Sequence, residues 1–494
     1  MSVGKNIWYT SISTLIPSTF AYLFWFVTAK MYGAETIGVA STIASLVIII
    51  ATINVLDMHL GMKRSLGIAI SSGDIGRFKQ ILTSTVVFVS IIVIISMVLI
   101  VIPNLKILEM LRIDRQYTWI LIAMILAQAF QYIFIEALIS ALRSKNLVMP
   151  LLLGSLSRFP ILFGVAYLFN TSTMETIIAF SSTVFISTAF FAIYSIKIFR
   201  GSQVRATENL CSNIMHILRV SVSSWIPNIL YIFGYLFGII TVFSVVGAAE
   251  GGKLYIVMGT FIIILFIVNS INKVTHSLVA GLNNNEQQTT YLSYSMKVAF
   301  IFTMPLAMPL LFFANNFLGI VNKEFSSAAS AMSIFMISLP MVIISEMVYY
   351  FVYGRGDQKS VLFLGLTGNI PRVVLYFFLS PILGINGAAL AFLVGSVTQF
   401  VLSVKVGNKH SISMQFRKYI ILTTIPLTIG FLTWLVNINF VISTIIIFIG
   451  SFLLYIRLHM FTDTELHNLI YTGLPASQAN KVYPIASKVM QKIK

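Results

Sequence analysis

Charge is what this sequence has least of. Only 10% of the 494 residues are Asp, Glu, Lys or Arg, whereas 58% are hydrophobic. Soluble globular proteins carry about 25% charged residues, so this composition excludes an ordinary water-soluble domain. It predicts instead a chain that crosses a lipid bilayer many times, with about 20 apolar residues for each crossing.

Several sequence motifs that are typical of enzymes and of metal or disulfide sites are also absent from the sequence. The single cysteine, Cys211, lies in a predicted cytoplasmic loop, so disulfides play no part. The sequence has no Gly-x-x-x-x-Gly-Lys-Ser/Thr loop for ATP hydrolysis and no cluster of Cys and His with metal-ligand spacing. No predicted external loop is large enough for the active site of a membrane glycosyltransferase. We therefore predict that the protein is not an enzyme and needs no cofactor.

Fourteen apolar spans of roughly 20 residues can be marked along the chain. With the N-terminus inside, 24 of the 32 Lys and Arg fall in cytoplasmic loops and tails, and only Arg158 and Arg372 lie within spans. The remaining six are in external loops: Lys30, Lys106, Arg112, Arg115, Lys253 and Lys323. This bias predicts a multi-pass protein of the cytoplasmic (inner) membrane with both termini cytoplasmic. It also accounts for the net charge of +17 without a nucleic-acid partner.

Two octets of the sequence read almost alike. Leu153–Pro160 (LGSLSRFP) reappears 211 residues later as Leu364–Pro371 (LGLTGNIP). Offsets of 210–214 also relate Tyr32-Gly33-Ala34-Glu35 to Val246-Gly247-Ala248-Ala249-Glu250, Ile16-Pro17 to Ile226-Pro227, Ser65-Leu66 to Ser277-Leu278, Ala179-Phe180 to Ala391-Phe392, and Glu136 to Glu346. This ordered recurrence indicates an internal duplication of a six-span unit. An even number of spans inserts both copies the same way round, which predicts two parallel lobes with a cleft between them.

The duplication predicts an all-α polytopic membrane protein with five parts. These are an N-lobe at 1–200, a cytoplasmic linker at 201–220, a C-lobe at 221–410, two terminal membrane helices at 411–461 and a cytoplasmic tail at 462–494. Gly33, Gly38 and Gly61 are expected to allow close packing of helices rather than to bind a ligand.

The two intramembrane arginines are the strongest candidates for function. Arg158 and Arg372 lie 13 residues beyond Lys145 and Lys359, hence at a common depth of about 20 Å. A charge at membrane depth is costly and by default functional. Guanidinium groups match phosphate geometry, which favours an anion site that includes Asn369, the repeat counterpart of Arg158. The alternative is a structural ion pair with an acid on a neighbouring helix.

Other charged residues allow two interpretations each. Glu136 and Glu346, the only acids deep within spans, either bind a coupling proton or sodium ion or neutralise the arginines. Lys63 and Arg64 follow the second span, with Asp57 and His59 close before them. They either guide an anionic lipid headgroup into the cleft or are ordinary positive-inside residues.

Three segments carry a resemblance to a known family. They are the opening Gly4–Trp8, the turn Tyr32–Gly38 and the segment Leu60–Arg64. Together with the duplicated unit and the terminal helix pair, they resemble the polysaccharide transporter branch of the multidrug/oligosaccharidyl-lipid/polysaccharide exporter superfamily. This branch contains the Wzx-type flippases of O-antigen and capsule.

The resemblance implies a V-shaped transporter that alternates between inward-open and outward-open states. It implies a polyprenyl-pyrophosphate-linked glycan as the substrate, received by a cationic cavity to which Arg158 and Arg372 would contribute. It also implies contact with membrane lipid and a polysaccharide polymerase or assembly protein as a partner. Related lipid II flippases have essential arginines in their first helix, and the first span here has none inside, which favours the glycan branch.

Two other classes of transporter compete with this interpretation. An ion-coupled, multidrug-type antiporter for small molecules has a similar architecture. A major-facilitator carrier is a further alternative, but the Gly-x-x-x-Asp-Arg-x-Gly-Arg loop expected after the second span is replaced by Asp57–Arg64 (DMHLGMKR).

Overall fold

The computed structural model describes residues 3–101, 113–165, 172–199, 210–282, 284–460 and short pieces at 480, 483–484 and 487–488. All regular elements in these ranges are helices. The first half contains α1 (Val3–Val55), α2 (Met58–Ser71), α3 (Ile75–Val101), η2 (Arg115–Tyr117), α5 (Thr118–Ser140), α6 (Lys145–Val165) and α7 (Ser172–Phe199). The second half contains α8 (Leu210–Val245), α9 (Ala248–Gly281), α10 (Asn285–Phe312), α11 (Ala314–Val321), η3 (Lys323–Ala328), α12 (Ala329–Gly354), α13 (Gln358–Lys409), α14 (Phe416–Leu435) and α15 (Phe440–Arg457).

Twelve helices in the described ranges are long and apolar enough to cross a membrane. Two of them, α1 with 53 residues and α13 with 52, are far longer than the hydrocarbon layer requires. Each is broken at one glycine with positive φ, Gly33 (80°) in α1 and Gly384 (59°) in α13. Glycine adopts this backbone region without steric cost, so one residue suffices to join two spans. Counting each broken helix twice gives the fourteen predicted crossings.

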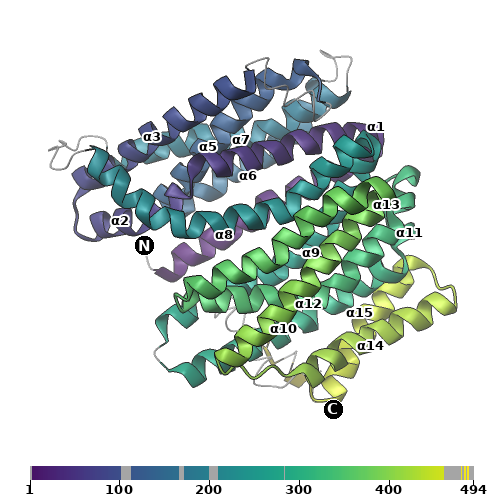
Figure 1. Ribbon diagram of the computed structural model, residues 1–494. Coiled ribbons are helices and arrows are strands. Elements are labelled where there is room, and N and C mark those ends of the chain that lie inside the picture. Colours follow the sequence, from purple (N-terminus) through teal and green to yellow (C-terminus); the bar gives the residue numbers. More distant parts are fainter. Residues whose placement is uncertain are drawn as a thin grey trace.

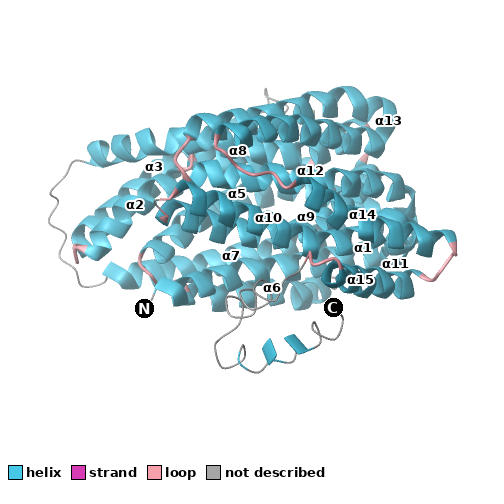
Figure 2. Cartoon of the chain, turned by 90° about the horizontal axis from the view of Figure 1, so that it is seen from below, coloured by secondary structure: helices cyan, strands magenta, loops and turns pink. Residues whose placement is uncertain are grey.

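The long helices run roughly along one common direction and form two lobes (Figures 1 and 2). The first lobe contains α1 to α7 and the second contains α8 to α13. In Figure 1, α14 and α15 lie at the edge of the second lobe, where both pack against α10. This arrangement confirms the predicted class of two six-span units followed by a helix pair.

The contact between the lobes is itself pseudo-symmetric. The Ala248 carbonyl lies against Gly38, and the Ala34 carbonyl lies against Gly252, so that neither glycine has room for a Cβ. Both pairs are related by the same offset of 214 residues. Each unit therefore presents the same two residues to the other, as in an interface with two-fold symmetry. The predicted packing role of Gly38 is confirmed.

A second contact joins the lobes at the opposite end of the bundle, where α1 ends and α2 begins. Leu56 and Asp57 adopt positive φ values of 49° and 53° there. This turn directs the buried Asp57 toward α8, where its Oδ1 accepts a hydrogen bond from Asn228 Nδ2 at 2.8 Å. Gly61 packs against Ser221 and the Ile217 carbonyl, again with no room for a Cβ. We call this the basic end, because it also contains the Arg143–Lys145 and Arg355–Asp357 turns.

The connection between the lobes differs from the prediction. Helix α8 already begins at Leu210, so the second half of the predicted linker at 201–220 is helical. Cys211 therefore lies in the first turn of a helix rather than in a loop. Almost all of the predicted tail at 462–494 lies outside the described residues.

Candidate functional site: two caged arginines and two acids

Arg158 is enclosed by aromatic rings of its own lobe. Helix α6 places its guanidinium 4.8 Å from the ring centre of Phe180 on α7 and 5.7 Å from that of Phe24 on α1. Only 4% of Arg158 is exposed, and its Nε and Nη1 have no protein acceptor among the described residues. A buried cation normally has hydrogen-bond acceptors as well as aromatic contacts, so Arg158 has capacity for an anion.

The environment of Arg158 extends to the second lobe. Tyr255 on α9 lies within electrostatic range of the guanidinium. The Tyr255 ring packs edge-on against Trp25 at 4.9 Å, and Trp25 packs against Phe180 at the same distance. The arginine thus lies close to the surface where the lobes meet, and a movement of one lobe against the other would change its surroundings.

Arg372 has a similar cage but a different hydrogen-bonding state. Its guanidinium is 4.2 Å from the ring centre of Phe392 and 5.4 Å from that of Tyr235. It donates from Nη1 to Asn369 Oδ1 at 3.0 Å and from Nη2 to Ser396 Oγ at 3.0 Å and Gln399 Oε1 at 3.4 Å. With 1% exposure, Arg372 lies in the C-lobe interior with both terminal nitrogens hydrogen bonded, and only its Nε lacks an acceptor among the described residues.

The two cages follow the duplication closely. Phe180 and Phe392 form one of the repeat pairs noted in the sequence, and Phe24 and Tyr235 are related by 211 residues. Sequence analysis used the first pair only as a mark of duplication and missed that each ring covers the arginine of its lobe. The signal was available, because an arginine and an aromatic residue recur together in both units.

The structure places the predicted site residues in several environments. Asn369 is hydrogen bonded to Arg372, whereas no contact joins Arg158 to Arg372, and neither arginine forms an ion pair with a described carboxylate. These contacts bear on the two interpretations of the arginines, an anion site and a structural ion pair with an acid. Direct pairing with Glu136 or Glu346 is absent from the part of the chain that the structure describes.

Glu346 is a buried acid of the C-lobe. Helix α12 buries it to 4% exposure, and it forms no hydrogen bond or ion pair with any described residue. Arg372 and four tyrosines lie within electrostatic range of its carboxylate: Tyr231, Tyr235, Tyr349 and Tyr350. A buried carboxylate near hydroxyl groups is suited to take up and release a proton or a monovalent cation.

Glu136, the repeat counterpart of Glu346, is paired. Its Oε2 lies 3.2 Å from Lys63 Nζ, with half of the lysine side chain exposed. Sequence analysis considered pairing of Glu136 with the arginines, whereas the described partner of Glu136 is Lys63. Arg64 lies on α2, but its side chain is not among those that the structure describes.

His59 contributes no charge to this region. It stacks on Tyr132 with 5.5 Å between ring centres. Burial, together with the nearby charge of Lys63, lowers the pKa of His59 to about 4. The imidazole is therefore neutral at physiological pH, and Lys63 remains the described cation of this segment.

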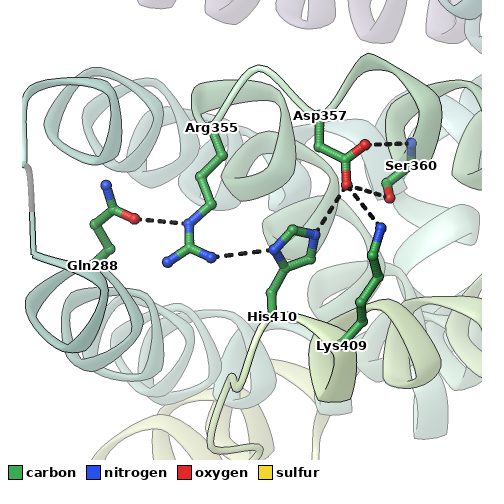
Figure 3. Close-up of polar contacts among 6 residues, drawn as sticks. All are labelled: Gln288, Arg355, Asp357, Ser360, Lys409 and His410. Carbon is green, nitrogen blue, oxygen red and sulfur yellow. Dashed lines mark hydrogen bonds and ion pairs between the residues drawn. The ribbon is translucent and has the colours of Figure 1, made fainter.

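A polar cluster at the basic end ties together three turns of the C-lobe (Figure 3). Arg355 Nε donates to Gln288 Oε1 at 2.7 Å, and Arg355 Nη1 lies 3.2 Å from His410 Nδ1. His410 Nε2 lies 3.0 Å from Asp357 Oδ2, which also accepts from Ser360 Oγ at 2.7 Å. Burial raises the pKa of Asp357, but the hydrogen bonds from Ser360, His410 and Lys409 outweigh it and lower the pKa well below its usual range.

Replacing Asp357 by asparagine should lower the free energy of unfolding by about 1–3 kcal/mol, since the charged acceptor of this cluster is lost. A depressed carboxyl pKa stabilises the fold fully above the unfolded value of about 3.9, and this contribution is lost only as the pH falls from there through the lower folded-state pKa. The difference from the parent in detergent should therefore be large at pH 7, still largely present near pH 3.5, and smaller only in stronger acid. Asp74→Asn, which keeps the side-chain cap that Arg77 N donates to, is the control with little expected loss. A difference that disappears already at pH 5, well above the unfolded pKa, would contradict this account.

Comparisons with known proteins rest on the fold. No protein-family model matches the chain, and no curated protein matches it by sequence. It is similar to the structure of the lipid II flippase MurJ in an inward closed conformation, with a TM-score of 0.72 and 14% identity over 90% of this chain and 98% of that chain.

Multidrug resistance transporters share the fold as well. An inward-facing MATE family transporter of the MOP superfamily matches with a TM-score of 0.65 and 15% identity, over 81% of this chain and 98% of its own. An outward-facing MATE structure matches with a TM-score of 0.58 and 16% identity, over 83% and 96%. The chain therefore has the two-lobed helical fold of the transporters in this superfamily.

Proposed function

We propose that the protein is a flippase that moves a polyprenyl-pyrophosphate-linked oligosaccharide across the cytoplasmic membrane by alternating access, for the assembly of a surface polysaccharide or glycan. The observation that carries this proposal is the buried Arg158, which lacks an acceptor among the described residues at two nitrogens and lies beside the contact between the lobes. A pyrophosphate offers the oxygen acceptors that the guanidinium lacks.

Each remaining site residue has a role in this proposal. Arg372 and Asn369 hold the C-lobe wall of the cleft, because their hydrogen bonds are made within that lobe. Lys63 and Arg64 lie at the basic end, where they would attract the anionic headgroup before it reaches Arg158. Glu346 would couple the conformational change to a proton or sodium ion, whereas Glu136 stays paired with Lys63.

The direct test measures transport of the proposed substrate. Protein reconstituted in vesicles should move a fluorescent polyprenyl-pyrophosphate oligosaccharide between leaflets, and a polyprenyl monophosphate without sugar should be a poorer substrate. The second candidate, a small-molecule antiporter, is favoured by the tyrosine-rich surroundings of Glu346, which suit an organic cation. Efflux of an organic cation without movement of the lipid-linked glycan would replace the flippase by the antiporter.

Glu346→Gln should abolish the dependence of transport on an imposed ion gradient, because a neutral amide cannot carry the coupling charge. Glu136→Gln is the matched control, since it removes the repeat-related acid that is already paired with Lys63. Transport by parent, control and mutant would be compared with and without a proton or sodium gradient. Unchanged gradient dependence in Glu346→Gln would show that this acid is structural.

The orientation of the chain follows from its charge asymmetry. Basic residues on one side of the membrane predict that the basic end and both termini face the cytoplasm. Reporter fusions after Gly201 and at the C-terminus should therefore give cytoplasmic signals. A fusion in the α14–α15 turn at Val436–Asn439 should give an external signal as the internal control. An external signal at Gly201 would reverse the assignment of the lobes.

A further inference from the structure

Glu324 of the C-lobe forms a hydrogen bond across the lobe interface to the break in α1. It lies on η3, between α11 and α12, and its Oε1 accepts from the Ala34 N–H of the N-lobe at 2.5 Å. The contact is at the end of the bundle opposite the basic end, which the charge asymmetry predicts to be external. It is separate from the arginine cages and from the surroundings of Glu346.

The break in α1 explains why the Ala34 amide needs an acceptor. Gly33 has non-helical backbone angles (φ 80°, ψ −174°), so a new helical segment starts after it. The first N–H groups of a helix have no intrahelical acceptor, and a negative charge beside them is favourable. Ala34 is only 1% exposed, so water does not reach this amide while the lobes are in contact. Glu324 therefore caps an N-lobe helix from the other lobe.

Gly33 also leaves the space that the carboxylate occupies. A Cβ at this position would lie 2.5 Å from Glu324 Oε1, so a side chain here would displace the carboxylate. The close packing that the sequence predicted for Gly33 is thus against a side chain of the other lobe. The Ala34 carbonyl lies against Gly252 at the same place, so both backbone polar atoms of Ala34 face the C-lobe.

The repeat shows that this interface can close without a carboxylate. The equivalent turn of the second unit, Gly247–Ala248, packs its Ala248 carbonyl against Gly38 in the same way. No described atom lies within 4 Å of the position of a Cβ at Gly247. Among the described residues, the hydrogen bond of Glu324 is therefore an addition on one side of a pseudo-symmetric contact. Hydrogen bonds weaken steeply with distance, so a separation of the lobes by a few ångströms would break it.

We propose that the Glu324–Ala34 hydrogen bond stabilises the state in which this end is closed and breaks when the lobes open there. An interaction made in only one of two conformations shifts the equilibrium toward that conformation. Opening would expose both groups to water, so the effect is the net value of one partly exposed hydrogen bond. This role rests on the alternating-access movement of the proposed function but not on its substrate, and an antiporter would share it.

Glu324→Ala should raise the ratio of molecules open at this end to molecules closed there by about fivefold, the effect of one such hydrogen bond. Glu324→Gln keeps an oxygen acceptor without the charge, so its effect should be smaller. Since Glu324 is exposed and its N–H remains within reach of Asn322 Oδ1, both variants should fold normally.

Distances between spin labels would report the two populations. One pair, at the exposed Gln116 on η2 and Asn316 on α11, spans this end. A second pair, at the exposed Lys145 and Lys359, spans the basic end. Cys211, the single cysteine, is replaced by serine in every variant.

Glu250→Gln is the matched control. Its carboxylate also lies at this end, in the first turn of α9, but its described partner is Lys253 of the same helix, with Glu250 Oε1 and Lys253 Nζ 2.7 Å apart. The substitution should leave both label distances unchanged, because this pair does not cross between the lobes.

A longer distance at this end in Glu324→Ala, with the basic end unchanged, would support the proposal. An unchanged distance in Glu324→Ala, or an equal increase in Glu250→Gln, would overturn it. Longer distances at both ends would also overturn it, because they would indicate general loosening. The readout is a distance rather than transport. A parent that opens at this end without moving the lipid-linked glycan would therefore contradict the flippase proposal and leave the role of Glu324 standing.

Discussion

Replacing Arg372 by alanine should destabilise the protein by about 3–5 kcal/mol, because two hydrogen bonds from a charged donor are lost at about 1.5–3 kcal/mol each. The guanidinium donates to Asn369, Ser396 and Gln399 while it stacks on Phe392. The alanine variant would leave these acceptors without their donor in a site that water does not reach. Thermal unfolding in detergent, monitored by loss of soluble monomer, measures the effect.

The duplication provides a matched control for this prediction. Arg158→Ala removes the same residue type from the equivalent helix, and it breaks no hydrogen bond to a described residue. It loses two aromatic contacts of about 0.5–2 kcal/mol but also removes a desolvated charge. Its stability should therefore stay within about 1 kcal/mol of the parent. Equal destabilisation by the two substitutions would show that the hydrogen bonds of Arg372 do not distinguish the lobes.

The sequence predicted which residues to examine but not which of them are satisfied. Fourteen crossings, two units and two arginines at a common depth all followed from apolar runs and repeat offsets. The difference between the arginines depends on positions four and seven residues beyond each covering ring. These hold Ser396 and Gln399 in the C-lobe but Val184 and Ser187 in the N-lobe.

The N-lobe therefore cannot reproduce the C-lobe network. The Val184 side chain contains no hydrogen-bond acceptor. Ser187 Oγ already accepts a hydrogen bond from Gln131 Nε2 at 2.5 Å. A repeat alignment shows the exchange of residue types. Only the structure shows that Gln131 is hydrogen bonded to Ser187, because the two residues lie on different helices and are 56 positions apart in the chain.

For the two acids the partnered group is in the other lobe than for the two arginines. Among the described residues, Glu136 is paired and Glu346 has no partner, so each lobe keeps one buried ionisable group without a counter-charge, Arg158 in the N-lobe and Glu346 in the C-lobe. The reason is the neighbourhood of each acid. The turn after α1 brings Lys63 to Glu136, whereas four tyrosines and Arg372 lie within electrostatic range of Glu346 without forming an ion pair among the described residues. A duplicated scaffold can in this way offer one site for an anionic substrate and another for a coupling cation.

Arg158→Ala should reduce transport of the lipid-linked glycan by at least about tenfold, which corresponds to the loss of one charged hydrogen bond of 1.5–3 kcal/mol. Arg158→Lys should restore only part of the rate, since an ammonium keeps the charge but not the two-pronged geometry that a pyrophosphate matches. Lys145→Ala removes an exposed cation from the first turn of the same helix and should transport normally. Initial flipping rates in vesicles with matched protein content would be measured for all three variants. Normal transport by a stable Arg158→Ala variant would exclude this arginine as the receiver of the pyrophosphate.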